Sequence, residues 1–337
     1  MSVAVDTPPA PPWFEDLPVG TVFSAAPSLT LTEGHAALHQ AITGDRLRIA
    51  LDRPLGEATA GAGPPVAHPA LVWDTAIGQS TVATGRVVAN LFYRGLLLRR
   101  VVRLGDTLHT TTEVVARREN RVKPGRRPTG LALLRIRTVD QERRPVLDFT
   151  RCAMLPLRDD PTGAAGDEVG GAADLDAGPL RAAADGLELA AYRAAVPGPH
   201  FDAVADGWAV EIEGGDVVDS APALARLTLN AAMAHLDSGS TADGRRLVYG
   251  GHAIGLAAGQ AARALPALVT ILGWHSCEHT APVFEGDTLR SRLALERREP
   301  LPGGGGLLHL RSRVTAARAD GAEDAEVLDW RFVAVLA

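Results

Sequence analysis

The string His275-Ser276-Cys277-Glu278-His279 is the part of the sequence that most directly suggests chemistry. It matches H-x-x-E-H, the signature of the inverted zinc proteases. Two histidines four residues apart can share one zinc ion when they lie on a helix. Residues 267–274 (ALVTILGW) favour a strand instead, and on a strand the two imidazoles would stand roughly 13 Å apart at 3.3 Å per residue. The spacing therefore argues against zinc, and we predict no metal site.

Nucleophilic and nucleotide chemistry have little support in the sequence. Cys277 lies in the same predicted strand without an activating base close in sequence, so we expect a buried thiol. The sequence contains no G-x-S-x-G elbow, no Rossmann glycine fingerprint and no P-loop. The glycine run at 303–306 is better explained as a hairpin loop. We therefore expect no cofactor.

The elements that would position any site come from an internal duplication. Residues 105–108 (GDTL) recur at 286–289, and residues 146–149 (VLDF) recur as VLDW at 327–330. The two matches share one displacement, because 286 − 105 and 327 − 146 both equal 181. We call this displacement the repeat offset. Repeated units of this kind decide the fold and must be found first.

The duplication divides the chain into four segments. The stretch 158–186 is rich in Gly, Ala, Asp and Pro, offers little to bury, and is interpreted as a linker. We predict a disordered N-terminus at 1–12, an N-terminal unit at 13–157 and a C-terminal unit at 187–337.

Each unit is expected to combine an antiparallel sheet with a buried helix. Apolar and polar residues alternate over 108–114, 289–296 and 308–314, which is typical of half-buried strands. Residues 252–265 are small and apolar almost all round, which indicates a buried helix, and Pro266 ends it. The predicted fold class is α+β, with two antiparallel sheets each wrapped round a long central helix: a double hotdog.

Composition excludes several classes of partner. The chain has 337 residues, 34 basic and 40 acidic side chains, and a net charge of −6, so no basic field would attract nucleic acid. It lacks an apolar run of about 20 residues and the features of a signal peptide at its start. Its two cysteines cannot build a disulfide framework. We therefore expect a cytoplasmic protein that binds neither nucleic acid nor membrane.

Several segments spread over nearly the whole chain match one known family. They are 13–17 (WFEDL), 19–20 (VG), 89–91 (ANL), both Gly-Asp-Thr-Leu turns and, most specifically, 244–252 (GRRLVYGGH). In these segments the sequence resembles the MaoC-like hydratases and dehydratases of acyl-CoA thioesters, and within them the mesaconyl-CoA hydratase (β-methylmalyl-CoA dehydratase) type. The resemblance implies a hydro-lyase that adds or removes water at the carbon pair beside a thioester, with CoA present only as part of the substrate.

The family's acid/base pair is written Gly-Asp-x-x-x-x-His. In the second unit it falls on Asn230 and His235, with an amide in the place of the acid. In the first unit Asp45 is present, but Ala50 stands where the histidine would be. The resemblance therefore gives the proton transfer to His235, and leaves Asn230 to orient water or substrate, because an amide cannot exchange a proton at neutral pH. Glu278 is a candidate to replace the missing carboxylate.

Hydration also needs a donor for the negative charge that develops on the thioester oxygen, and the free N–H groups at a helix start provide one. Gly250 and Gly251 open the second long helix, and we predict Gly251 as the donor. With a displacement one larger than the repeat offset, Pro69 matches Gly251, and proline has no N–H to give. We therefore predict that the second unit is catalytic and that the first walls the substrate tunnel.

A dicarboxylic substrate needs a cation near the helix start. Arg245 and Arg246 immediately precede it and suit a carboxylate; the alternative, that both are solvated, stays open. The same string supplies the remaining predicted substrate-binding residues, Tyr249, Gly250 and His252.

Three functions remain open. The first is hydration or dehydration of a short branched or dicarboxylic enoyl-CoA, most like mesaconyl-CoA. The second is dehydration of a secondary-metabolite thioester of CoA or acyl carrier protein. The third, suggested by the amide at position 230, is a non-catalytic acyl-CoA-binding hotdog protein. Exposed sheet edges lead us to expect a homo-oligomer.

Overall fold

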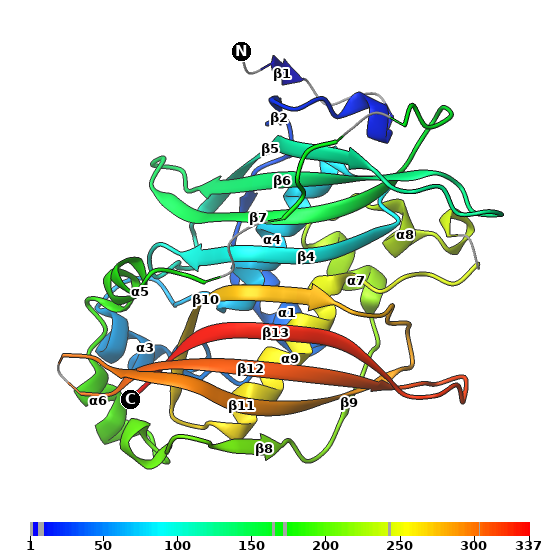
Figure 1. Ribbon diagram of the computed structural model, residues 1–337. Coiled ribbons are helices and arrows are strands. Elements are labelled where there is room, and N and C mark those ends of the chain that lie inside the picture. Colours follow the sequence, from blue (N-terminus) through cyan, green and yellow to red (C-terminus); the bar gives the residue numbers. More distant parts are fainter. Residues whose placement is uncertain (1–2, 6–9, 164–165, 171–173, 242–243, 303) are drawn as a thin grey trace.

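One continuous sheet runs through both halves of the chain (Figure 1). The computed structural model describes residues 3–5, 10–163, 166–170, 174–241, 244–302 and 304–337. In these residues the strand order is β1-β2-β5-β6-β7-β4-β10-β13-β12-β11-β8, with β3 paired to β5 and β9 to β11. The double hotdog prediction is confirmed at the level of this architecture.

The first unit packs its central helix against its own sheet. Helix α4 is buried along its whole length and contacts β5 and β6, so even its polar residues, Asp74 among them, are enclosed. The elements in chain order are β1 (Val3–Val5), η1 (Phe14–Asp16), β2 (Thr21–Phe23), β3 (Leu29–Thr30), α1 (Glu33–Thr43), α2 (Arg48–Leu51), α3 (Arg53–Ala60), α4 (Pro69–Ser80), η2 (Thr81–Ala83), β4 (Ala89–Leu98), β5 (Thr107–Glu119), β6 (Thr129–Val139) and β7 (Pro145–Pro156).

The second unit repeats this plan around α9, which runs to Ala264 just before Leu265 and Pro266 and contacts β11 and β13. The predicted helix at 252–265 is thereby confirmed, with a start at Gly250 rather than His252. The elements are α5 (Ala177–Ala184), α6 (Leu189–Ala195), η3 (Phe201–Ala203), β8 (Ala209–Glu211), β9 (Asp216–Val217), α7 (Ala221–Leu227), α8 (Met233–Leu236), η4 (Ser238–Ser240), α9 (Gly250–Ala264), β10 (Leu268–His279), β11 (Thr288–Pro300), β12 (Gly306–Ala317) and β13 (Ala325–Leu336).

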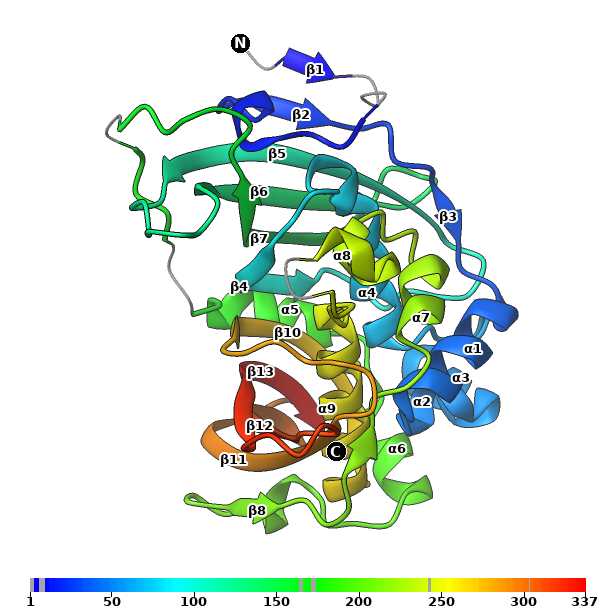
Figure 2. The ribbon, with the colours of Figure 1, turned by 90° about the vertical axis from the view of Figure 1, so that its right-hand side faces the viewer.

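Strands β4 and β10 join the units, and their pairing shows that the duplication is structural. They are antiparallel, with Leu97 opposite Gly273 and Phe92 opposite Glu278. Residue 97 moved forward by the repeat offset becomes Glu278, which is the partner of Phe92. Residue 92 moved forward in the same way becomes Gly273, which is the partner of Leu97. This exchange of partners is what a two-fold relation between the units requires. Figure 2 shows α4 and α9 side by side, between the curved sheet and the outer helices α1, α3 and α7.

An aromatic cluster fills the junction between the units. Trp73 on α4 lies 4.9 Å from Trp274 on β10 and 6.3 Å from Trp330 on β13 between ring centroids, in edge-to-face geometry. All three indole rings are fully buried. Such pairs contribute about 0.5–1.5 kcal/mol each beyond the area they bury, so this cluster binds the two units together.

Two predicted unstructured segments contain elements. Residues 3–5, within the predicted disordered start at 1–12, form β1 parallel to β2. The predicted linker at 158–186 includes α5, whose Leu180 is buried and which contacts β10. The remainder of these two segments at 1–2, 6–9, 164–165 and 171–173, together with Gly303 of the glycine run, lies outside the described residues. In the described chain no helix has the length and hydropathy that crossing a membrane requires.

Candidate functional site

The start of α9 brings glycine backbone against polar side chains from two other elements. The N–H groups in the first turn of a helix have no partner within it. A Cβ atom at Gly250 would lie 2.5 Å from Nε2 of His279, and one at Gly251 would lie 2.1 Å from Oδ1 of Asp74. Only glycine allows this approach.

His235 on α8 lies beside this helix start. Its ring centroid lies 5.7 Å from that of Tyr249, the residue that precedes α9. Its Nδ1 is 2.9 Å from the carbonyl oxygen of Leu247. Because a carbonyl only accepts, Nδ1 carries the hydrogen and Nε2 is left with a free electron pair.

Burial keeps this imidazole neutral. The pKa of His235 is lowered to about 4: burial is the main cause, the hydrogen bond to Leu247 opposes it, and the positive charge of Arg151 contributes a smaller decrease. His235 is 9% exposed. At neutral pH its Nε2 can therefore accept a proton from a bound water molecule.

Asn230 holds the turn that carries α8. Leu229 before it has a φ of 58°, a left-handed conformation that is uncommon for leucine. The Asn230 side-chain oxygen accepts from the N–H of Ala232 at 3.0 Å, and its Nδ2 is buried without a partner among the described residues. The amide thus supports the loop through one atom and leaves one donor available.

His279 is a site residue that the sequence analysis missed. It ends β10, and its Nε2 is buried beside Gly250 without a partner in the described chain. Its pKa is lowered to about 4, mainly by burial and to a smaller extent by His235, so the two imidazoles lie within electrostatic reach of each other. The sequence analysis treated it only as part of the zinc signature. Its position at the end of a strand that faces the glycine helix start is a tertiary feature.

A carboxyl from the first unit lies beneath the same helix start, and it was also missed. Asp74 on α4 is fully buried; its Oδ2 lies 3.0 Å from His39 Nε2, and its Oδ1 accepts from the Tyr249 hydroxyl at 3.2 Å. Burial raises the pKa of Asp74 against the opposing effects of His39 and Tyr249. The predicted substrate-binding residue Tyr249 is therefore fixed by the other unit.

Both predicted arginines are occupied by acidic partners. Arg246 is paired with Glu285, and its side chain is 32% exposed. Arg245 pairs with Asp320 at 3.0 Å, and its guanidinium lies 3.6 Å over the Phe284 ring. Both guanidinium groups therefore already hold a carboxylate of this chain, while Nε of Arg246 is buried without a partner among the described residues.

Glu278 and His252 have different surroundings. Glu278 pairs with Arg94 at 2.6 Å, and successive side chains of a strand point to opposite faces, so Glu278 points away from the helix start that His279 faces. It does not replace the carboxylate at position 230. His252 is fully buried, its two ring nitrogens have no partner among the described residues, and burial lowers its pKa to about 4.

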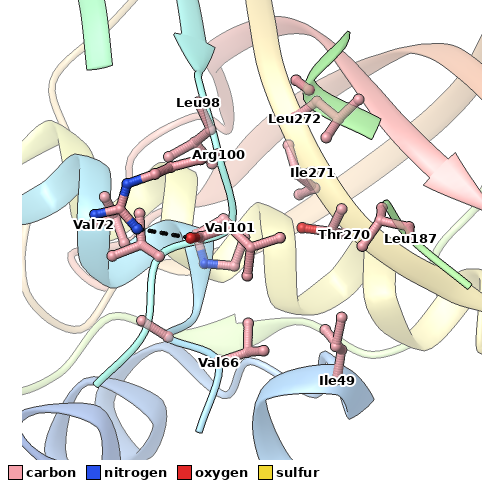
Figure 3. Close-up of a pocket in the computed structure, with 14 residues that line it drawn as sticks. Ile49, Val66, Val72, Leu98, Arg100, Val101, Leu187, Thr270, Ile271 and Leu272 are labelled. Carbon is pink, nitrogen blue, oxygen red and sulfur yellow. Dashed lines mark hydrogen bonds between the residues drawn. The ribbon is translucent and has the colours of Figure 1, made fainter. Parts of the chain in front are cut away.

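The equivalent place in the first unit, at the start of α4, is lined mostly by apolar residues, with Arg100 and Thr270 as the polar exceptions (Figure 3). The cavity there is about 30 Å³, which is room for one or two water molecules. Leu98 corresponds to His279 at the repeat offset, and Ile49 and Val66 line the same cavity. A buried pair lies nearby, with His68 Nδ1 3.0 Å from Asp45 Oδ2. Burial alone would raise the pKa of Asp45, but His68 lowers it below its ordinary value.

The structure corrects the predicted equivalence of Pro69 and Gly251 by one residue. Pro69 is the first residue of α4, and Gly250 is the first of α9. The preceding residues, His68 and Tyr249, have nearly identical backbone angles. Proline therefore removes the N–H that corresponds to Gly250, and the repeat offset holds here as elsewhere.

Two proteins of similar sequence act on CoA thioesters according to their names. The chain is 29% identical over 317 residues to the β-methylmalyl-CoA dehydratase of Chloroflexus aurantiacus, covering 91% of this chain and 88% of that protein. It is 29% identical over 305 residues to the mesaconyl-CoA hydratase of Cereibacter sphaeroides, covering 89% and 88%. No family model matches the sequence.

Solved structures agree with this likeness. A conserved hypothetical protein from Mycobacterium tuberculosis with a double hotdog fold superimposes with a TM-score of 0.88 at 51% identity, over 96% of this chain and 98% of that one. A protein from Chloroflexus aurantiacus described as a MaoC domain protein dehydratase gives 0.82 at 27% identity, over 97% of both. In this fold and in these relatives, the chain is similar over nearly its whole length to the MaoC-like hydratases and dehydratases.

Proposed function

We propose that the protein adds water to, or removes it from, the α,β carbon pair of a short branched or dicarboxylic enoyl-CoA thioester such as mesaconyl-CoA. The observation that carries this proposal is the neutral imidazole of His235, fixed through Nδ1 with Nε2 free at the start of α9. The names of the two relatives supply the expected substrate class.

In the proposed hydration, Nε2 of His235 takes a proton from water while the water oxygen attacks the β-carbon. The electrons move to the thioester oxygen, which the N–H groups of Gly250 and Gly251 stabilise, together with the dipole of α9. The imidazolium then returns its proton to the α-carbon. A general base of this kind contributes roughly 10²–10⁴ in rate, and one backbone donor roughly 10²–10³.

Asn230 and His279 complete the proposed site. Asn230 cannot exchange a proton, so its free Nδ2 is given the role of orienting water or the substrate. His279 is the second imidazole beside the helix start and is proposed to share the movement of the proton. Tyr249 forms a wall of the site against the His235 ring, and CoA takes part only as a portion of the substrate.

Loss of the enoyl-thioester absorbance tests the proposal. The wild-type protein should hydrate mesaconyl-CoA faster than crotonyl-CoA, which lacks the second carboxylate. A preference for crotonyl-CoA would contradict the dicarboxylic substrate. Absence of turnover with both would favour the binding protein, and turnover only with a carrier-protein thioester would favour the secondary-metabolite enzyme.

We also propose a cytoplasmic homo-oligomer. The outer edges of β1 and β8 end the sheet and pair with no other strand in the described residues, and an open edge is a site for association. Light scattering coupled to size-exclusion chromatography tests the oligomeric state; a mass near the 35.3 kDa of one chain would contradict it.

A further inference from the structure

Arg151 is a buried cation whose hydrogen-bond partners are neutral. It lies on β7 and is 2% exposed. Its guanidinium donates to Thr84 Oγ1 at 2.7 Å, to the Ser80 carbonyl at 3.2 Å and to Asn90 Oδ1 at 3.3 Å. Across the described residues, no carboxylate oxygen lies within 4.0 Å of its nitrogens. Burial lowers the pKa of Arg151, but a guanidinium stays charged in proteins.

A buried charge without a counter-ion is costly. The penalty for removing an ion from water is several kcal/mol after relaxation, and proteins offset it by pairing the charge. Arg318 illustrates this rule, because its side chain is only 10% exposed and pairs with Asp287 at 2.7 Å. Arg151 lacks such a partner in the described chain, so an anion from outside would recover the cost.

The fold itself does not require a cation at this position. At the repeat offset Arg151 corresponds to Phe332, which is fully buried and stacks on Trp330 with ring centroids 4.0 Å apart. An aromatic side chain therefore satisfies the packing at the equivalent point of the second sheet. The arginine in the first sheet needs a separate reason.

Arg151 lies beside the segment that supports the helix carrying His235. It donates to Thr84, and the next residue, Gly85, accepts from the N–H of Met233 at the start of α8. The charge of Arg151 also reaches His235 and Tyr249. Asn90 at the start of β4 corresponds to Ile271 at the repeat offset, and Ile271 lines the cavity at the start of α4. By the two-fold relation between the units, Asn90 lines the corresponding space at the start of α9.

Two unused donors lie together at this point. Nε of Arg151 and Nδ2 of Asn90 are both buried without a hydrogen-bond partner among the described residues. We infer that Arg151, assisted by Asn90, binds the free carboxylate of a dicarboxylic acyl-CoA substrate. This inference rests on the proposed function and names the group that recognises the acyl chain, in place of Arg245 and Arg246.

The test compares two substrates in the full-length Arg151→Gln variant. We expect kcat/KM for mesaconyl-CoA to fall about 10²–10³-fold, as when one partner of a buried charge pair is removed, and that for crotonyl-CoA to fall less than tenfold. Asn90→Leu should show the same selectivity with a smaller loss. Equal losses for both substrates in Arg151→Gln would overturn the inference.

Arg135→Gln is the matched control. Arg135 lies on the neighbouring strand β6, is partly exposed and pairs with Asp148 at 2.7 Å, so its replacement should leave both activities within twofold. If wild type hydrates neither thioester, the proposed function fails. If wild type prefers mesaconyl-CoA and Arg151→Gln retains that preference, only the present inference fails.

Folding of the variant is checked by circular dichroism and thermal unfolding. Arg151→Lys keeps the charge while losing the planar fork, and should give a selective loss for mesaconyl-CoA smaller than that of Arg151→Gln. Independently of any variant, methylsuccinyl-CoA should inhibit the wild-type enzyme at least tenfold more strongly than butyryl-CoA. Equal inhibition by the two saturated thioesters would also overturn the inference.

Discussion

The starts of α9 and α4 occupy equivalent places in the two units but carry different chemistry. At α9 the backbone is glycine, and His235 and His279 face it. At α4 the first residue is Pro69, and Leu98 takes the place of His279. The helix geometry is the same in both, so the fold supplies a potential anion site twice and the side chains decide which one can react.

The comparison also shows that the first unit does more than wall a tunnel. It places the buried Asp74 carboxyl under Tyr249, and it places Arg151 within electrostatic reach of His235. The site at α9 is therefore built from both units. The second unit also contributes to the cavity at the start of α4, but the residues that β10 places there, Thr270, Ile271 and Leu272, carry no charge. The first unit thus contributes polar side chains to the site at α9, whereas β10 of the second unit contributes no charged side chain to the cavity at α4.

The largest expected effect comes from His235→Ala. This change gives the second unit an alanine where the first unit has Ala50, its equivalent of His235. Without the base, kcat for mesaconyl-CoA hydration should fall about 10²–10⁴-fold. The enoyl-thioester absorbance measures this, with Ala50→Ser as a control that should stay within twofold. Near-normal turnover in His235→Ala would remove the imidazole from the mechanism.

Exchange at the helix start should have the next largest effect. Gly250→Pro removes one N–H and reproduces Pro69; proline is tolerated at the first helical position, so α9 should form. We expect kcat to fall by up to about 10²–10³, including a contribution from displacing His279. The reverse change, Pro69→Gly, should leave kcat within twofold; a similar loss in that variant would mean that the two starts are not functionally distinct.

Replacement of His279 by Leu copies the first unit at Leu98. We expect a decrease in kcat of about tenfold to a hundredfold, because one of two imidazoles that can carry a proton is lost. His279→Gln, which keeps a polar group, should lose less than His279→Leu when both are assayed at neutral pH. Equal activity in the wild type and both variants would restrict the proton transfer to His235.

A feature of the fold or of the site can be predicted from the sequence when neighbouring residues determine it, and not when it depends on contacts between residues far apart in the chain. The repeat offset, α9 and the strand at Leu268–His279 follow from local patterns and from comparison of the chain with itself. The contributions of Asp74 and Arg151 do not, because they reach the site across the unit boundary. The ion pair of Arg245 could not be predicted for the same reason, since its partner Asp320 comes from a distant hairpin.

The smallest effect concerns pH. Because burial lowers the pKa of His235 to about 4, the base stays neutral and kcat/KM should change less than twofold between pH 7 and 5, then decrease below about pH 4. The free energy of unfolding should already fall from about pH 6.5 downward, since unfolded histidines bind protons at their ordinary pKa while the buried ones do not. Denaturant titrations at each pH measure this; an activity midpoint near 6.5 would contradict the effect of burial.

The continuous pairing of β4 with β10 has a consequence for how such a protein can change over generations. Two identical hotdog chains joined along that edge would repeat every mutation at both helix starts. One covalent chain fixes a one-to-one ratio of unlike halves, so Arg151 on β7 can coexist with Phe332 on β13. In one covalent chain, each half can therefore carry different side chains at equivalent positions while the pairing of β4 with β10 keeps the two halves together.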